Sequence, residues 1–346
     1  MKPHFPILDG LRGTAATLVV IYHLLGISFP VPSLNPMHHG YMAVDFFFLL
    51  SGFVVGYAYD DRWDKMSIWS FFKVRLIRLH PLVILGTILG ALAFWFDPFL
   101  HFPEKSSLLK LLIVMFIGFT LFPGPRGWEN THPLDPPSWS LLQEYIANIL
   151  YAVFVRHFNK IGLAALVLIS GIVLTWVSVT HGDISGGWDY KTIGFAFIRI
   201  FYPFFGGLLL FRLGKLIHIP NAYLICSLGL ILLFFMPRFS FNGIFDAACI
   251  IFVFPLIVAM GAGGELNQNW NKVCRFMGDI SYPIYMIHYP CIFMYTNWIA
   301  TCKPSQSLII GVGIALFIFI MTFGYAVLKL YDEPVRSWLK GKFLKS

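Results

Sequence analysis

The segment LDGLRGTAATLVVIYHLLG, residues 8–26, carries two side chains that are able to do chemistry inside an apolar helix. Arg12 and His23 are eleven residues apart, which places both on one face of a helix, about 16 Å apart along its axis. Burial favours the neutral imidazole, the form that accepts a proton. A histidine in this setting either serves catalysis or makes a structural hydrogen bond to a neighbouring helix. Because ionisable groups are costly to bury in a bilayer, both residues are functional candidates.

Two acidic residues lie in other apolar stretches. Asp45 stands near the start of GYMAVDFFFLLSGFVVGYAY, residues 40–59, and Glu144 lies one to two turns inside the helix expected over 136–152. A carboxylate this close to hydrocarbon needs a partner or water. Ser51 marks the middle of the first stretch and is followed by a glycine. This pair indicates either close helix packing through small residues or a functional hydroxyl.

Basic and polar residues also repeat at helical spacing. In KVRLIRLHP, residues 73–81, Arg75 and Arg78 share one face of a helix that enters the membrane. They suit either anionic lipid headgroups or a phosphate-rich ligand. Further on, GDISYPIYMIHYP, residues 278–290, places a serine, a tyrosine and a histidine in one polar stripe, typical of either an interhelical network or a site.

The elements that position these residues are predicted to be transmembrane helices. Of the 346 residues, 58% are hydrophobic and only 12% are charged, whereas soluble domains carry about 25% charged residues. The formal net charge of +8 comes from short basic clusters beside apolar segments, which is typical of positive-inside topology and not of nucleic-acid binding. The five cysteines have no CxxC or zinc-like spacing and predict neither a disulfide framework nor a metal site.

Eleven apolar segments alternate with short polar connectors between residues 14 and 330. Eleven crossings would put the basic connectors RHFNK and RLGK outside, against the positive-inside rule. We therefore predict an all-α polytopic membrane protein with about ten transmembrane helices, in which the short segment 108–122 is non-crossing or re-entrant. Both termini are then cytoplasmic, and residues 1–346 form a single integral membrane domain with no appended soluble domain.

The order of these motifs resembles the membrane-bound acyltransferase family 3, the O-acyltransferases that modify sugars of bacterial envelopes. Six motifs along essentially the whole chain carry the resemblance: LDGLRGTAATLVVIYHL, VDFFFLLSGFVVG, RLIRLHP, WSLLQE, ISYPIYMIHYP and LYDEPVRSWL. Many members have Phe-Tyr after the glutamate of the fourth motif, where this chain has Ala147 and Asn148. This departure puts the acceptor in doubt, not the family.

The resemblance implies an O-acetyltransferase of the bacterial cytoplasmic (inner) membrane. It would move an acyl group, normally acetyl from cytoplasmic acetyl-CoA, to a hydroxyl of an extracytoplasmic carbohydrate such as lipopolysaccharide O-antigen or exopolysaccharide. His23 is then the candidate general base, with Glu144 or Asp45 orienting the acceptor or the imidazole. The candidate donor-binding residues are Arg12, Arg75, Arg78 and Ser51. The expected partners are acyl-CoA, the envelope carbohydrate and membrane lipids, with no metal and no nucleic acid; the oligomeric state is open.

Several alternatives are compatible with the same residues. The acyl group is acetyl or succinyl, and transfer is direct or passes through an acyl-enzyme on Ser51 or a cysteine. The acceptor is alternatively a lipid-linked sugar or a small metabolite. A carbohydrate transporter without acyl transfer would also need polar residues in the membrane, but transport does not require the arginine pair and the chain shows no internal repeat. A structural membrane partner explains the helices but not the alignment of Arg12 with His23.

Overall fold

The computed structural model describes residues 4–31, 34–100, 107–128 and 130–344, and these residues form helices and no strands. Two isolated bridges are the only extended pairings in this part of the chain. The helices are α1 (Pro6–Ser28), η2 (Gly40–Met42), α2 (Ala43–Tyr59), α3 (Ile68–Phe96), α4 (Leu108–Phe119), α5 (Ser138–Val153), η4 (Val155–His157), α6 (Lys160–His181), α7 (Ile193–Leu213), α8 (Ala222–Phe234), α9 (Asn242–Ala248), η5 (Cys249–Val253), α10 (Phe254–Gly263), α11 (Gln268–Cys302), α12 (Gln306–Val327), η6 (Leu328–Asp332) and α13 (Glu333–Phe343).

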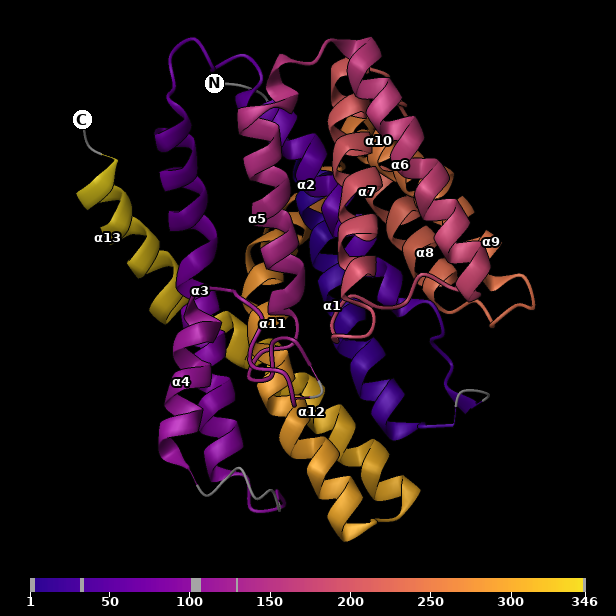
Figure 1. Cartoon of the computed structure of the whole chain (residues 1–346). Coiled ribbons are helices and arrows are strands. Elements are labelled where there is room, and N and C mark those ends of the chain that lie inside the picture. Colours follow the sequence, from indigo (N-terminus) through magenta and orange to yellow (C-terminus); the bar gives the residue numbers. More distant parts are fainter. Residues whose placement is uncertain (1–3, 32–33, 101–106, 129, 345–346) are drawn as a thin grey trace.

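The fold confirms a polytopic helical membrane protein. Within the described residues, seven helical stretches are long and apolar enough to cross a bilayer, and α8 is a shorter apolar helix. The helices α5 and α11 run through the same bundle (Figure 1). The start of α1 and the end of α13 both lie towards the top of Figure 1, which fits the prediction that the two ends share one side of the membrane. The count of ten crossings and the cytoplasmic orientation remain predictions.

The helix α4 is the short segment that was predicted not to cross. Its 12 residues reach about 18 Å, well short of the 30 Å of a bilayer core. It lies beside the lower part of α3 (Figure 1). Apolar side chains of α3, α4 and the loop before α5 form a cluster of their own, made of Ala91, Leu111, Val114 and Leu134. The chain therefore doubles back along α3 before α5 begins.

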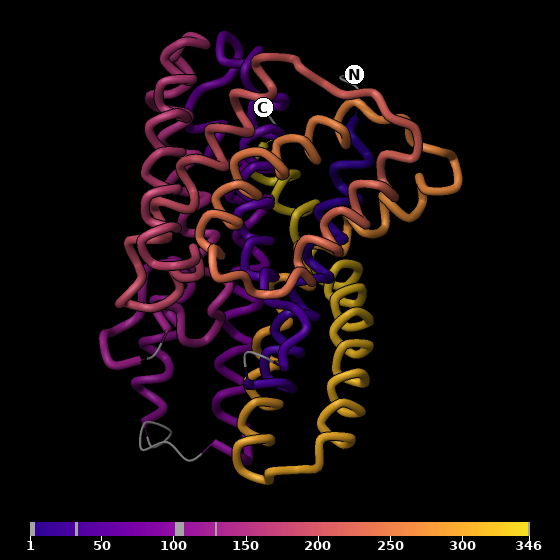
Figure 2. The backbone as a smooth tube through the Cα atoms, turned by 90° about the vertical axis from the view of Figure 1, so that its right-hand side faces the viewer, coloured from indigo at the N-terminus to yellow at the C-terminus, as the bar shows by residue number. Residues whose placement is uncertain are grey.

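Two close helix contacts set the geometry of the centre. The helices α1 and α11 pack along one another, and a Cβ atom at Gly13 would lie 2.3 Å from the carbonyl oxygen of Met277. The helices α2 and α7 meet equally closely, since a Cβ atom at Gly52 would lie 1.8 Å from the carbonyl oxygen of Phe204. Only glycine permits backbones to approach this far. In Figure 2 the indigo α1 lies inside the bundle, with later helices around it.

Candidate active site

A cavity of about 180 Å³ lies between α1, α2, α3, α5, α11 and the chain around η6 and α13. Five of the seven site residues predicted from the sequence line it: Arg12, Ser51, Arg75, Arg78 and Glu144. His23 and Asp45 are not among its lining residues. The tertiary structure thus brings together the predicted donor-binding residues and Glu144, and places the other two elsewhere.

Glu144 is the centre of a three-residue cluster in this cavity. Its Oε1 accepts a hydrogen bond from Ser51 Oγ at 2.6 Å and from Arg75 Nη2 at 2.5 Å. The side chain of Arg75 is only 3% exposed, and its Nε has no hydrogen-bond partner among the residues that the structure describes. The ion pair explains how Glu144 is tolerated within the bundle, because a buried carboxylate needs a charged or donating partner. The same contacts leave the Nε–H of Arg75, one of the five N–H donors of its guanidinium, without a partner among the described residues.

Arg12 is tied to α11 by two hydrogen bonds. Its Nε donates to Ser281 Oγ at 2.9 Å and its Nη2 donates to the carbonyl oxygen of Gly278 at 3.0 Å. Asp9, one turn earlier on α1, lies 3.1 Å from the same guanidinium. These contacts hold Arg12 at the cavity wall, so its planar donor group is pre-positioned rather than free in solvent.

Arg78 differs from the other arginines of the cavity. It has no hydrogen bond or ion pair to a described residue, whereas Arg12, Arg75 and Arg336 each have a carboxylate partner. Eight charged residues line the cavity: Asp9, Arg12, Arg75, Arg78, Glu144, Asp279, Asp332 and Arg336. Because four are basic and four acidic, net charge alone does not favour an anion here. The unpaired Arg78 is therefore the group best able to attract one.

Arg336 and Asp332 also line the cavity, although the spacing of residues in the sequence does not single them out. They form an ion pair of 2.7 Å at the junction of η6 and α13. Both lie within the last of the six motifs, LYDEPVRSWL, and this position is the one feature of the sequence that points to them as site residues.

Tyr285 belongs to the polar stripe of residues 278–290. Its hydroxyl lies 2.8 Å from Ser140 Oγ on α5, so this part of the stripe forms an interhelical hydrogen bond.

His23 lies beyond the cavity, next to α11. The last residue of α1 that lines the cavity is Ala16, seven residues earlier, which corresponds to about 10 Å along the helix axis. The His23 ring centroid is 5.3 Å from that of His288 and 5.1 Å from that of Tyr289. His23 is partly buried, whereas His288 is fully buried. The cavity therefore ends about two turns of α1 before the His23 imidazole.

Asp45 has the charged partner that its position demands. Its carboxylate binds Arg199 of α7 at two points, with Nη2 to Oδ2 at 2.6 Å and Nε to Oδ1 at 3.1 Å. Both side chains are at most 1% exposed. Arg199 also donates to the carbonyl oxygens of Gly186 and Tyr41, each at 2.8 Å. This arrangement ties α2 to α7, and the signal for it in the sequence is a lone arginine in the apolar stretch IGFAFIRIFYP.

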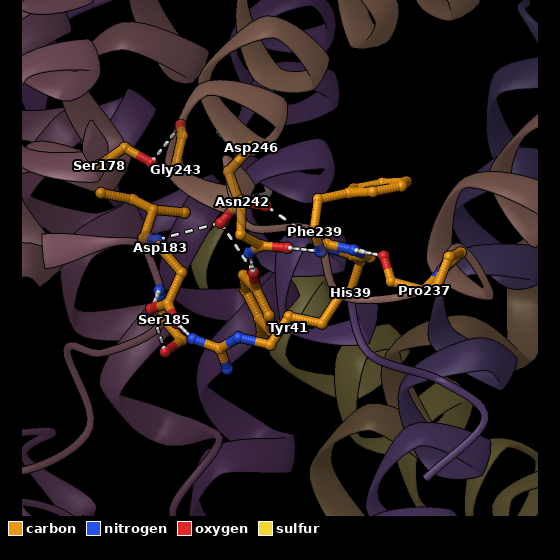
Figure 3. Close-up of polar contacts among 12 residues, drawn as sticks. His39, Tyr41, Ser178, Asp183, Ser185, Pro237, Phe239, Asn242, Gly243 and Asp246 are labelled. Carbon is orange, nitrogen blue, oxygen red and sulfur yellow. Dashed lines mark hydrogen bonds and ion pairs between the residues drawn. The ribbon is translucent and has the colours of Figure 1, made fainter. Parts of the chain in front are cut away.

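A second buried network adjoins this pair (Figure 3). The Tyr41 hydroxyl donates to Asp246 Oδ2 at 2.7 Å and accepts from Asn242 Nδ2 at 3.1 Å. His39 Nδ1 lies 3.3 Å from Asp246 Oδ1, and its Nε2 donates to the carbonyl oxygen of Pro237 at 3.2 Å. The network connects the turn before α2 with α9 and with the chain before α9. It stabilises the N-terminal end of α2, and its residues do not line the cavity.

The loop between α4 and α5 buries another carboxyl group. Asp135 Oδ2 accepts a hydrogen bond from Ser138 Oγ at 2.8 Å, while Oδ1 has no partner within the described residues. Burial raises the pKa of Asp135 to about 7, although the bond from Ser138 opposes the rise.

All five cysteines are free thiols, and no group of three His, Cys, Asp or Glu side chains in the described part of the chain is arranged to hold a metal ion.

The fold and the site together define a class of protein: a helical membrane bundle with an internal cavity lined by charged residues. The family model described as "Acyltransferase domain" matches residues 5–331, and the chain belongs to this family, which confirms the resemblance. No solved structure matches the chain.

Three relatives illustrate the range of the family. "Protein 2 in picA locus" of Rhizobium radiobacter is 31% identical over 181 residues, which are 49% of this chain and 92% of that protein. "Acyltransferase MdmB" of Streptomyces mycarofaciens is 31% identical over 167 residues, 45% of this chain and 40% of the relative. "Peptidoglycan O-acetyltransferase OatA" of Listeria monocytogenes is 22% identical over 335 residues, 88% of this chain and 52% of the relative. The chain thus spans about half or less of the length of the two relatives that are named as transferases.

Proposed function

We propose that this protein is an O-acetyltransferase that moves acetyl from cytoplasmic acetyl-CoA to a hydroxyl of an extracytoplasmic carbohydrate, such as lipopolysaccharide O-antigen or exopolysaccharide. Membership of the acyltransferase family supports the reaction class. The observation that carries the donor assignment is the unpaired Arg78 in a cavity that also holds Arg12 and Arg75. We further propose that the protein resides in the bacterial cytoplasmic membrane, where coenzyme A is available on one side.

The size of the cavity supports a particular way of holding the donor. A volume of about 180 Å³ is smaller than the 300 Å³ or more of typical ligand pockets. It suits the pantetheine end of acetyl-CoA, with the phosphates beside the arginines that line the cavity. Arg78 and Arg75, which both line the cavity, then bind phosphate oxygens, for which guanidinium groups are well matched.

His23 is the proposed general base. A sugar hydroxyl is a weak nucleophile, so its proton must leave as the oxygen attacks the thioester carbonyl. His23 takes that proton, the new C–O bond forms, the C–S bond breaks, and the departing CoA thiolate recovers a proton from the imidazolium. The position of His23 on α1 beside α11, two of the helices that line the cavity, supports this role.

A covalent route through Ser51 is the alternative mechanism. The hydrogen bond from Ser51 Oγ to Glu144 favours it, because a carboxylate partner is able to activate a serine. Direct transfer needs no such intermediate. Incubation with [1-¹⁴C]acetyl-CoA and acid quenching would separate the two: we expect no labelled protein in the wild type, and label that disappears in Ser51→Ala would establish the covalent route.

The central experiment measures O-acetyl groups on surface polysaccharide by proton NMR. Cells would express the wild type, His23→Ala or Arg78→Ala at matched membrane abundance, with Arg126→Ala as the control for an exposed arginine outside the cavity. We expect the acetyl signal to be lost in both site variants and to stay at the wild-type level in the control. Normal acetylation in His23→Ala would refute the base assignment. Glycan mass increments of +42 or +100, expected for acetyl and succinyl, identify the acyl group, and absence of any transfer would favour a transporter.

A further inference from the structure

His288 on α11 has one nitrogen whose state the structure determines. Its Nδ1 lies 2.7 Å from the carbonyl oxygen of Tyr285 and 3.1 Å from that of Ile284. A carbonyl oxygen only accepts hydrogen bonds, so Nδ1 must carry the proton. The other nitrogen, Nε2, is therefore an acceptor with a lone pair.

That acceptor is buried and has no hydrogen-bond partner in the part of the chain that the structure describes. The His288 side chain is 0% exposed, and Nε2 is among the buried polar atoms that lack a partner. Buried polar atoms in native proteins are nearly always satisfied, and those that are not require an explanation. The hydrogen bonds from Nδ1 to the helix backbone explain the orientation of the ring, but they do not explain why an unpartnered Nε2 is buried.

Among the described residues, the nearest ring that carries an N–H is that of His23. The two imidazole centroids are 5.3 Å apart and their planes are inclined by 32°. The aromatic rings around the pair belong to Tyr22, Tyr285 and Tyr289. In enzymes without bound substrate, catalytic hydrogen bonds are often long and tighten in the reacting complex. Rotation of the His23 ring would bring one of its nitrogens towards His288 Nε2.

We propose that His288 is a positioning residue for the reaction. Its Nε2 accepts the N–H of His23 and so selects the tautomer in which the other nitrogen of His23 keeps its lone pair for the acceptor hydroxyl. The same bond stabilises the imidazolium that forms when His23 takes the proton, as an oriented partner does in other base-catalysed enzymes. His288 keeps its own Nδ1 proton throughout, so it neither gains nor loses a proton in the cycle. This inference rests on the proposed role of His23 as the base.

The test compares three variants in nanodiscs with [1-¹⁴C]acetyl-CoA and a panel of p-nitrophenyl hexosides as acceptors. His288→Phe keeps a flat ring but removes the acceptor, and His288→Gln supplies an amide oxygen near the position of Nε2. His80→Phe is the matched control, because His80 on α3 also has a buried nitrogen without a partner but does not line the cavity. We expect His288→Phe to lower kcat about 10- to 100-fold with KM for acetyl-CoA unchanged, His288→Gln to recover part of the loss, and His80→Phe to match the wild type.

A second readout does not depend on turnover. With ¹⁵N-labelled histidine, we expect one His23 tautomer in the wild type and a mixture of both in His288→Phe. A single, unchanged tautomer in His288→Phe, or wild-type kcat in that variant, would overturn the proposal. An equal loss in His80→Phe would also overturn it, because it would indicate a general packing effect. Failure of the proposed function is seen separately, as wild-type protein that transfers no acetyl or as full activity in His23→Ala.

Discussion

The guanidinium of Arg199 binds the carboxylate of Asp45 at two points in the interior of the bundle, although the two residues are 154 positions apart in the chain. Removing one partner of such a pair leaves an uncompensated buried charge, which costs about 3–5 kcal/mol. We therefore expect Asp45→Ala and Arg199→Met each to lower stability strongly, and the double variant Asp45→Leu/Arg199→Met to recover much of the loss. Thermal unfolding in detergent, followed by tryptophan fluorescence, measures this.

The exposed ion pair between Arg238 and Asp183 is the control for this prediction, since the Arg238 side chain is 59% exposed. Its loss in Arg238→Ala should change stability by about 1 kcal/mol or less. If Asp45→Ala unfolds like the wild type but loses acetyl transfer, the carboxylate serves catalysis instead of helix attachment.

Arg78 is expected to act through donor phosphates. Loss of a hydrogen bond to a charged group costs about 1.5–3 kcal/mol, so Arg78→Ala should raise KM for acetyl-CoA about 10- to 100-fold. With S-acetylpantetheine, which has no phosphate, the variant and the wild type should have the same kcat/KM. A similar defect with both donors would show that Arg78 supports the shape of the cavity and does not bind phosphate.

The raised pKa of the buried Asp135 carboxyl group should make the stability of the fold depend on pH. Its folded pKa is raised to about 7, above the value of about 3.9 for an unfolded chain, so the folded state holds the proton more tightly. Its stabilising contribution is full below about pH 4 and is lost as the pH rises through 7. We expect the wild-type Tm to fall between pH 5 and pH 8 relative to Asp135→Asn. The exposed Asp64→Asn should follow the wild type, and parallel curves for all three proteins would contradict the prediction.

Gly52 is expected to be required for the contact between α2 and α7. A methyl group there would lie 1.8 Å from the Phe204 carbonyl oxygen, so Gly52→Ala must push the helices apart. Overpacking of this kind costs about 1–3 kcal/mol or more. The control is Gly311→Ala on α12, where a Cβ atom meets nothing within 4 Å and where alanine favours the helix. Equal thermal stabilities of the two variants would argue against the close contact.

Much about this protein is determined by its sequence alone. Hydropathy acts over a single segment, so the membrane class and the short segment before α5 were predictable without a fold. The cost of placing charge in hydrocarbon also singled out Arg12, Glu144 and the arginines of RLIRLHP, and these residues do meet in one cavity.

Only the tertiary structure decided which partner each of these groups has. Arg12 donates to Ser281 across 269 positions of the chain, and the partner of Glu144 is set by how α5 is rotated against α2 and α3. Helical spacing gives the face on which a residue lies but not the helix that covers that face. For this reason Asp45, Arg12 and His23 look alike in the sequence, whereas packing pairs Asp45 with Arg199, places Arg12 at the cavity and sets the ring of His23 beside that of His288.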